Sequence, residues 1–85
     1  MLHDLEWRDP LNKERRKTLK EVHEHLSIAA DKLEDVVDDE RDSLDNTPEG
    51  LQETESYAER EDNLDEMQDV LDDIKLSMDT ISKMF

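Results

Sequence analysis

The sequence is poor in the residues that build disulfides, flexible loops and membrane spans. It has no cysteine, one glycine, two prolines and 4% aromatic residues among its 85 positions. Disulfides and thiolate metal ligands are therefore excluded, and so is a glycine-rich phosphate-binding loop. Apolar runs are no longer than Ile28-Ala29-Ala30, so we expect no transmembrane helix, no secretory signal and no large buried pocket.

Acidic residues are present in large excess. Asp and Glu number 26 against 11 Lys and Arg, which gives a net charge of −15, and 33% of the residues are hydrophobic. This composition is typical of disordered chains, and its charge opposes direct binding to nucleic acid. A disordered chain would not space its apolar residues regularly, however, and this chain does.

Two long segments place apolar residues at alternating gaps of three and four, which is the spacing of one helix face. The first segment has Leu19, Val22, Leu26, Ala29, Leu33 and Val36. The second, which Arg60 interrupts, has Tyr57, Leu64, Met67, Leu71, Ile74, Met78, Ile81 and Phe85. The spacing predicts two long helices, at about 11–45 and 48–84, and hence an all-α, coiled-coil-like protein.

The turn is expected at residues 45–52, which hold Gly50 and Pro48. Asn46 or Thr47 is a candidate cap for the second helix, with Pro48 in its first turn. Asn46 is equally suited to end the first helix in a left-handed conformation. So short a connection predicts an antiparallel helical hairpin.

The hairpin is expected to be a single domain, residues 11–85, after an N-terminal extension at 1–10. The apolar residues of the extension are expected to pack over the open end of the hairpin, near Phe85; the alternative is that they contact a partner as a recognition peg. They are Leu2, Leu5 and Trp7.

Residue numbers predict the register of the two helices. At one level of an antiparallel pair the two numbers have a constant sum, and a sum of 100 pairs Leu33 with Met67 and centres the turn on Gly50. The same sum pairs Glu40 with Arg60, the two charged residues that interrupt the apolar stripes. We predict a salt bridge between them that fixes the register.

Further apolar residues lie outside the expected seam. They are Ile28, Ala30, Val37, Leu44, Val70, Leu76 and Met84. They broaden the apolar face enough for a second contact, which is either a partner site or self-association into a four-helix bundle. We therefore expect a homodimer.

The charge is distributed unevenly along the chain. Residues 1–30 have a net charge of 0, residues 31–73 of −16 and residues 74–85 of +1. A hairpin therefore has a near-neutral open end and an acidic turn-side half. The candidate partner-binding residues in that half are Asp35, Asp38, Asp39, Asp42, Glu55, Glu59, Asp62, Asp65, Glu66, Asp69, Asp72 and Asp73.

Two functions fit this acidic half. Like charges four residues apart destabilise a helix, and a helix that needed only to be soluble would avoid this by interleaving lysines with its acidic residues. An electrostatic field of one sign also steers basic partners toward the surface. The acidic face is thus a candidate DNA mimic: a phage-type inhibitor, such as an anti-restriction or anti-CRISPR protein, in the nucleic-acid site of a host defence or DNA-processing protein. The alternative is a structural or adaptor bundle that acts through its apolar flank and whose acidity serves solubility.

Catalysis and metal binding have little support. Carboxylates three residues apart, such as Asp35 and Asp38, are expected by chance in so acidic a chain. His23 and His25 point about 200° apart around a helix, and the acidic stretches lie on helices rather than in an EF-hand loop. The best enzyme alternative is a helical Mg²⁺-dependent nucleotide pyrophosphatase. We expect no enzyme, no cofactor and no metal site.

The turn resembles that of a known group of proteins. Asp39-Glu40 and the box Asp45-Asn46-Thr47-Pro48-Glu49-Gly50-Leu51-Gln52-Glu53-Thr54 resemble a family of small acidic helical-hairpin proteins of phages, prophages and gut or Gram-positive bacteria. The turn of that family reads approximately Asn-x-Pro-Glu-Asn-Leu-Gln-x-Ser, from which Gly50 and Thr54 depart. The resemblance covers about residues 13–81. It implies a helical hairpin and a mobile-element origin, so we expect the cytoplasm of a bacterial host; no catalytic or binding residue is carried over.

Overall fold

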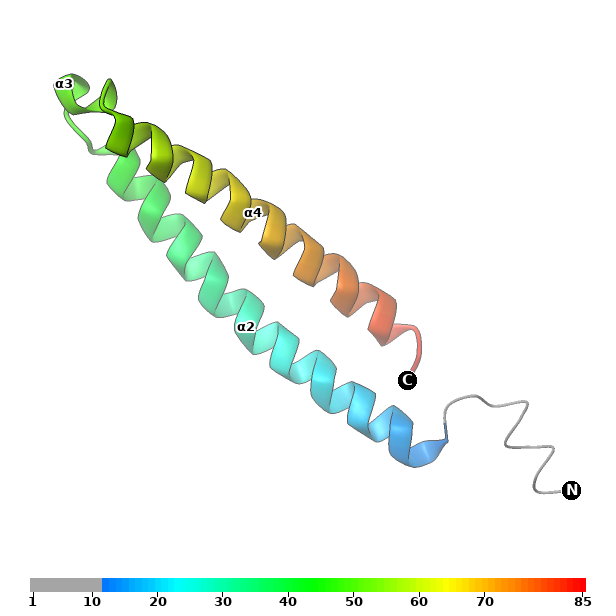
Figure 1. Cartoon of the computed structure of the whole chain (residues 1–85). Coiled ribbons are helices and arrows are strands. Elements are labelled where there is room, and N and C mark those ends of the chain that lie inside the picture. The colour runs from blue at the N-terminus through cyan, green and yellow to red at the C-terminus, as the bar shows by residue number, and fades with distance from the viewer. Residues whose placement is uncertain (1–11) are drawn as a thin grey trace, which may run out of the picture.

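The computed structural model describes residues 12–85, and over this range the chain forms helices and connections without any strand. Helix α2 spans Lys13–Asp45, α3 spans Glu49–Gln52 and α4 spans Glu55–Ser82. Figure 1 shows α2 and α4 side by side, running in opposite directions, with α3 at the end where they are connected. The all-α class is confirmed. The expected packing of Leu2, Leu5 and Trp7 lies outside the described residues.

Helix α2 begins slightly later than expected because Asn12 caps it. The Asn12 side-chain oxygen accepts a hydrogen bond from the Arg15 backbone N–H at 2.9 Å. This bond satisfies one of the amides that the start of a helix leaves without a partner. At the other end, Asn46 has a φ of −90°, so the left-handed ending considered for this residue is not used.

The second long helix begins at Glu55 rather than at about residue 48. Thr54 caps it, because its hydroxyl accepts a hydrogen bond from the Tyr57 backbone N–H at 3.2 Å. The same hydroxyl donates to the Leu51 carbonyl at 2.7 Å. The cap therefore ties the start of α4 to the preceding connection.

The expected caps, Asn46 and Thr47, are wrong for the second long helix. Pro48 opens only the four-residue α3, which no side chain caps. The Gln52 side chain donates to the Thr47 carbonyl at 2.8 Å, which folds the connection back on itself. The turn predicted at 45–52 is thus part of a longer connection that contains a helix of its own.

Helix α4 packs with the face that its spacing predicts, but Phe85, which was expected to continue this stripe, follows the helix and is 42% exposed. Leu71 is 2% exposed. The half-buried residues of the same stripe are Tyr57, Leu64, Met67, Ile74, Met78 and Ile81. Four residues expected outside the seam are indeed exposed: Ile28, Val70, Leu76 and Met84.

Helix α2 presents a different face from the predicted one. The residues that the spacing placed in the seam but that are exposed are Val22, Ala29 and Val36. The residues buried in their place, at 4%, 1% and 4% exposure, are Ala30, Val37 and Leu44. The prediction that these three lie off the seam is therefore wrong.

The predicted and the observed buried faces of α2 both contain the leucines that recur every seven residues. The predicted face adds the residue three positions after each leucine, and the observed face adds the residue four positions after it. At about 100° per residue, the choice rotates the buried face by about 50°. Apolar residues stand at both sets of positions, so the spacing does not choose between them. Near the turn the observed face buries Leu44 where the other would bury Ser43, and a buried leucine contributes roughly 1.5–3 kcal/mol.

Candidate functional site

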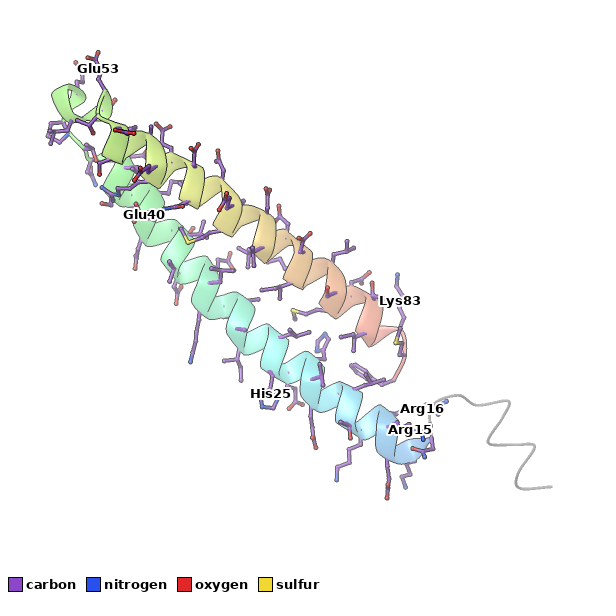
Figure 2. The ribbon with its side chains drawn as sticks, in the orientation of Figure 1. Arg15, Arg16, His25, Glu40, Glu53 and Lys83 are labelled. Atoms are coloured by element: carbon purple, nitrogen blue, oxygen red, sulfur yellow. The ribbon has the colours of Figure 1, made fainter. Side chains whose placement is uncertain are left out.

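The twelve candidate partner-binding carboxylates are all exposed. On each helix they occupy positions that turn away from the seam, at least about 130° from its centre. The helix pair therefore has two acidic faces, back to back, rather than one. Figure 2 shows oxygen-tipped side chains on both outer sides of the turn-side half, up to Glu53, with Arg15 and Arg16 at the other end of the pair.

The acidic half has a charge density close to that of duplex DNA. Residues 31–73 carry a net charge of −16. The two long-helix stretches, 31–45 and 55–73, carry −14 of this charge, and the remaining −2 lies in the connection. The α4 stretch is about 28 Å long, which gives roughly one net negative charge every 2 Å of axis. Duplex DNA carries about one every 1.7 Å. The protein therefore offers a basic surface a field of similar strength.

Among the described residues, 12–85, two of the twelve carboxylates contact another side chain. Asp38 lies 3.8 Å from Arg41 Nη1, and Asp72 accepts a hydrogen bond from Gln68 Nε2 at 3.1 Å. Arg41 and Gln68 also contact each other across the helix pair, because Arg41 Nη2 donates to Gln68 Oε1 at 3.2 Å. These contacts hold Asp38 and Asp72 at one edge of the pair.

A second polar contact lies along the same edge. Lys75 Nζ of α4 is 3.9 Å from Glu34 Oε2 of α2. Both side chains are about half exposed, and exposed pairs of this kind contribute little to stability. Their effect on the surface is that this edge of the seam is covered by polar side chains.

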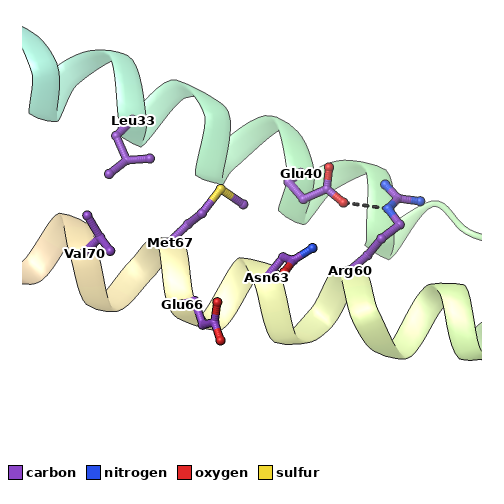
Figure 3. Close-up of a pocket in the computed structure, with 7 residues that line it drawn as sticks. All are labelled: Leu33, Glu40, Arg60, Asn63, Glu66, Met67 and Val70. Carbon is purple, nitrogen blue, oxygen red and sulfur yellow. Dashed lines mark hydrogen bonds and ion pairs between the residues drawn. The ribbon is translucent and has the colours of Figure 1, made fainter.

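Arg60 connects the two helices near the turn (Figure 3). Its Nε donates to Glu40 Oε1 at 2.7 Å, and its Nη2 donates to Ser43 Oγ at 2.8 Å. The side chains of Arg60 and Glu40 are 39% and 27% exposed. The contact expected from the residue numbers is present; that it fixes the register is still a prediction.

The other edge of the seam opens into a groove of about 540 Å³ beside this ion pair. The residues that line it, shown in Figure 3, are Leu33, Glu40, Arg60, Asn63, Glu66, Met67 and Val70. Glu66 is one of the twelve carboxylates. The sequence reasoning missed the groove because it placed Val36 in the seam, where its side chain would have covered this edge. The feature of the sequence that could have indicated the groove is Asn63, a short polar residue one helical turn after Arg60, where the apolar stripe is interrupted.

The histidines of the described chain are engaged separately. His25 Nδ1 lies 2.7 Å from the Glu21 carbonyl oxygen, and the His23 ring packs edge-on against Phe85, with centroids 5.6 Å apart. Within residues 12–85, no group of three or more His, Asp or Glu side chains is placed to hold a metal ion. Over the same residues, no helix combines the length and the apolar character needed to cross a bilayer.

The chain was compared with protein-family models, with curated proteins and with solved structures, and it matches none of them.

Proposed function

We propose that this protein is a non-enzymatic, acidic protein-binding module that occupies the nucleic-acid site of another protein as a DNA mimic. The observation that carries the proposal is the charge density of the turn-side half, roughly one net negative charge every 2 Å. A basic groove that binds phosphates through Lys and Arg would meet negative charge at a similar density along the axis. The field also speeds the encounter with such a partner.

The cost of this charge supports a role for it. Asp35 and Asp39, and likewise Asp65 and Asp69, stand four residues apart on exposed helix surface. Such like-charge pairs each destabilise a helix by about 0.2–0.5 kcal/mol. The first thirty residues also contain two like-charge pairs of this spacing, Lys13 with Lys17 and Arg16 with Lys20, but their net charge is 0. A surface needed only for solubility would have no reason to differ between the two halves.

The proposed scaffold is an antiparallel, coiled-coil-like helical hairpin that dimerises to a four-helix bundle. The resemblance of its turn to acidic proteins of phages and prophages favours an inhibitor of a host defence or DNA-processing protein, acting in the bacterial cytoplasm.

The second candidate is a structural or adaptor bundle that binds through its apolar flank. Val36 and Val70 favour it, because each is 50% exposed beside the seam. An adaptor of this kind would bind its partner through apolar contact, which salt weakens little. The two candidates therefore differ in how their binding responds to salt and to charge reversal.

The test is capture of partners from a nuclease-treated bacterial lysate at about 50 and 200 mM salt, the range over which binding to 6–10 phosphates weakens by about 10³–10⁵. The DNA-mimic proposal expects a nucleic-acid-binding protein that salt or added duplex DNA releases. Reversal of Asp62, Asp65, Glu66 and Asp69 to Lys should abolish the capture.

A matched control reverses four exposed acidic residues near the open end: Glu14, Glu21, Glu24 and Asp79. It changes the net charge by the same amount and should leave capture largely intact. Capture that is indifferent to salt, DNA and both reversals, but lost on Val70→Glu, would overturn the DNA mimic in favour of the adaptor.

A further inference from the structure

The rotated face of α2 leaves an ordered stripe on the protein surface. At intervals of seven residues it contains Arg15, Val22, Ala29, Val36 and Ser43. Val22 and Val36 are 40% and 50% exposed, and Ala29 is exposed between them. The apolar part of the stripe is symmetric about Ala29: a valine lies seven residues before this small residue and another lies seven residues after it.

The two ends of α2, beyond the apolar part of this stripe, carry opposite charges. Residues 13–20 have five basic side chains and one acidic, and residues 38–45 have five acidic and one basic. Their net charges are thus +4 and −4. The two segments lie at equal distances along the chain on either side of Ala29. When two α2 helices run antiparallel and cross at Ala29, the basic segment of each therefore lies beside the acidic segment of the other.

We propose that a second copy of this chain docks on the Val22–Ala29–Val36 stripe, with the two α2 helices antiparallel and the two-fold axis at Ala29. Val22 of each copy then packs on Val36 of the other, and the small Ala29 residues let the two helices approach closely. Each basic segment, 13–20, lies along the acidic segment, 38–45, of the other copy. The interface is isologous, as expected for a two-fold dimer.

The opposite orientation is unfavourable for a simple electrostatic reason. A parallel arrangement would place two segments of charge −4 against each other and two of +4 against each other. Helix α4 offers no equivalent stripe, because the corresponding positions are Ser56, Asn63, Val70, Ser77 and Met84. Both the charge and the apolar pattern therefore select α2 and the antiparallel direction.

This inference rests on the homodimer within the proposed function, but not on the identity of the acidic partner. It assigns separate roles to the two long helices. In the dimer, the basic segment of one copy offsets the acidic end of α2 in the other. The carboxylates of α4, from Glu55 to Asp73, are then the ones left for a basic partner.

The test uses the full chain with Val22→Lys, Val36→Glu and the double variant, and measures the dimer dissociation constant by sedimentation equilibrium. Each single variant should raise the constant at least about tenfold, because it buries an unpaired charge in an apolar contact. In the double variant, each introduced lysine faces an introduced glutamate of the other copy, so most of the loss should be restored. Leu76→Lys, on the exposed outer side of α4, should leave the constant unchanged.

Cysteine cross-linking provides an independent readout because the chain has no cysteine of its own. An oxidised mixture of Val22→Cys and Val36→Cys chains should cross-link the two variants to each other, and neither variant to itself. Cross-linking of each variant to itself would overturn the antiparallel arrangement and indicate a parallel one.

The remaining outcomes separate this inference from the proposed function. A wild-type dimer whose double variant stays dissociated overturns the Ala29-centred docking and leaves the dimer itself intact. A wild-type monomer over the whole concentration range overturns both the dimer and the docking, while capture by the acidic faces is decided by its own salt experiment. If Val22→Lys changes only the capture of a partner, the stripe belongs to that partner and not to a second copy.

Discussion

The turn-side half and the open-end half share one seam but differ in the forces across it. The turn-side half contains the buried Val37 and Leu44, the contact between Arg60 and Glu40, and most of the negative charge. At the open end Leu26 is only half-buried, and the net charge is close to zero. Tight packing and the chain connection therefore hold together the half whose charges repel, whereas the open end has neither strong repulsion nor tight packing.

The largest expected effect is a difference between two identical substitutions, Leu44→Ala and Leu26→Ala. Leu44 is 4% exposed, so its truncation should leave a cavity and lower the free energy of unfolding by about 3 kcal/mol. Leu26 is half-buried near the open end, and water can fill the space, so we expect about 1 kcal/mol there. Urea denaturation followed by circular dichroism measures both. Equal losses would contradict the unequal packing of the two halves.

The next effect concerns the ion pair of the turn-side half. Arg60→Leu leaves the half-buried Glu40 without its partner and should cost about 1–2 kcal/mol. Replacing both residues by leucine should recover this loss or exceed it, because an apolar pair needs no desolvation of charge. If the pair fixes the register, the double variant should be stable but heterogeneous. Its amide NMR spectrum would then show more than one set of peaks, and a single set would refute a register role.

The spacing of apolar residues predicted the buried face of α4, though not its start, because one face of that helix is apolar and its neighbours are acidic. Asp65, Glu66 and Asp69 leave only one direction for the seam. In α2 the stripe of leucines has apolar residues on both flanks, and the burial of Leu44 in place of Ser43 depends on the geometry of the connection. That geometry depends in turn on Thr54, which caps α4. The local sequence pattern offered Asn46 and Thr47 as caps and did not distinguish Thr54 from them.

The candidate site was predictable in composition but not in arrangement. Helical periodicity was enough to expect exposed carboxylates, because charged residues on a long amphipathic helix turn away from the seam. The groove beside Arg60 and the exposed valines of α2 depended on the rotation of that helix by about 50°. Periodicity does not determine a rotation of this size when apolar residues flank the stripe on both sides.

A smaller effect is expected from salt. Screening shortens the range of the repulsion within the acidic half, from about 30 Å at 0.01 M to about 8 Å at 0.15 M. The melting temperature should therefore rise by several degrees, about 1 kcal/mol in stability. The variant with Asp62, Asp65, Glu66 and Asp69 reversed to Lys should melt higher at low salt and respond less. A wild-type melting temperature that falls with salt would show that attraction, not repulsion, dominates this half.

The smallest effect is expected in the connection, where Gly50→Ala should stabilise the protein. Gly50 lies in α3 and has no positive φ, and a Cβ added there would meet no atom within 4 Å apart from its chain neighbours and the backbone of its own helix. Alanine therefore fits the same backbone and loses less conformational freedom on folding, which is a gain of about 0.5 kcal/mol. Thr54→Ala is the matched control: it removes the cap of α4 and should cost about 1 kcal/mol. Both values come from the same urea titrations. A loss on Gly50→Ala would instead mean that the turn depends on glycine for a conformation other than α3.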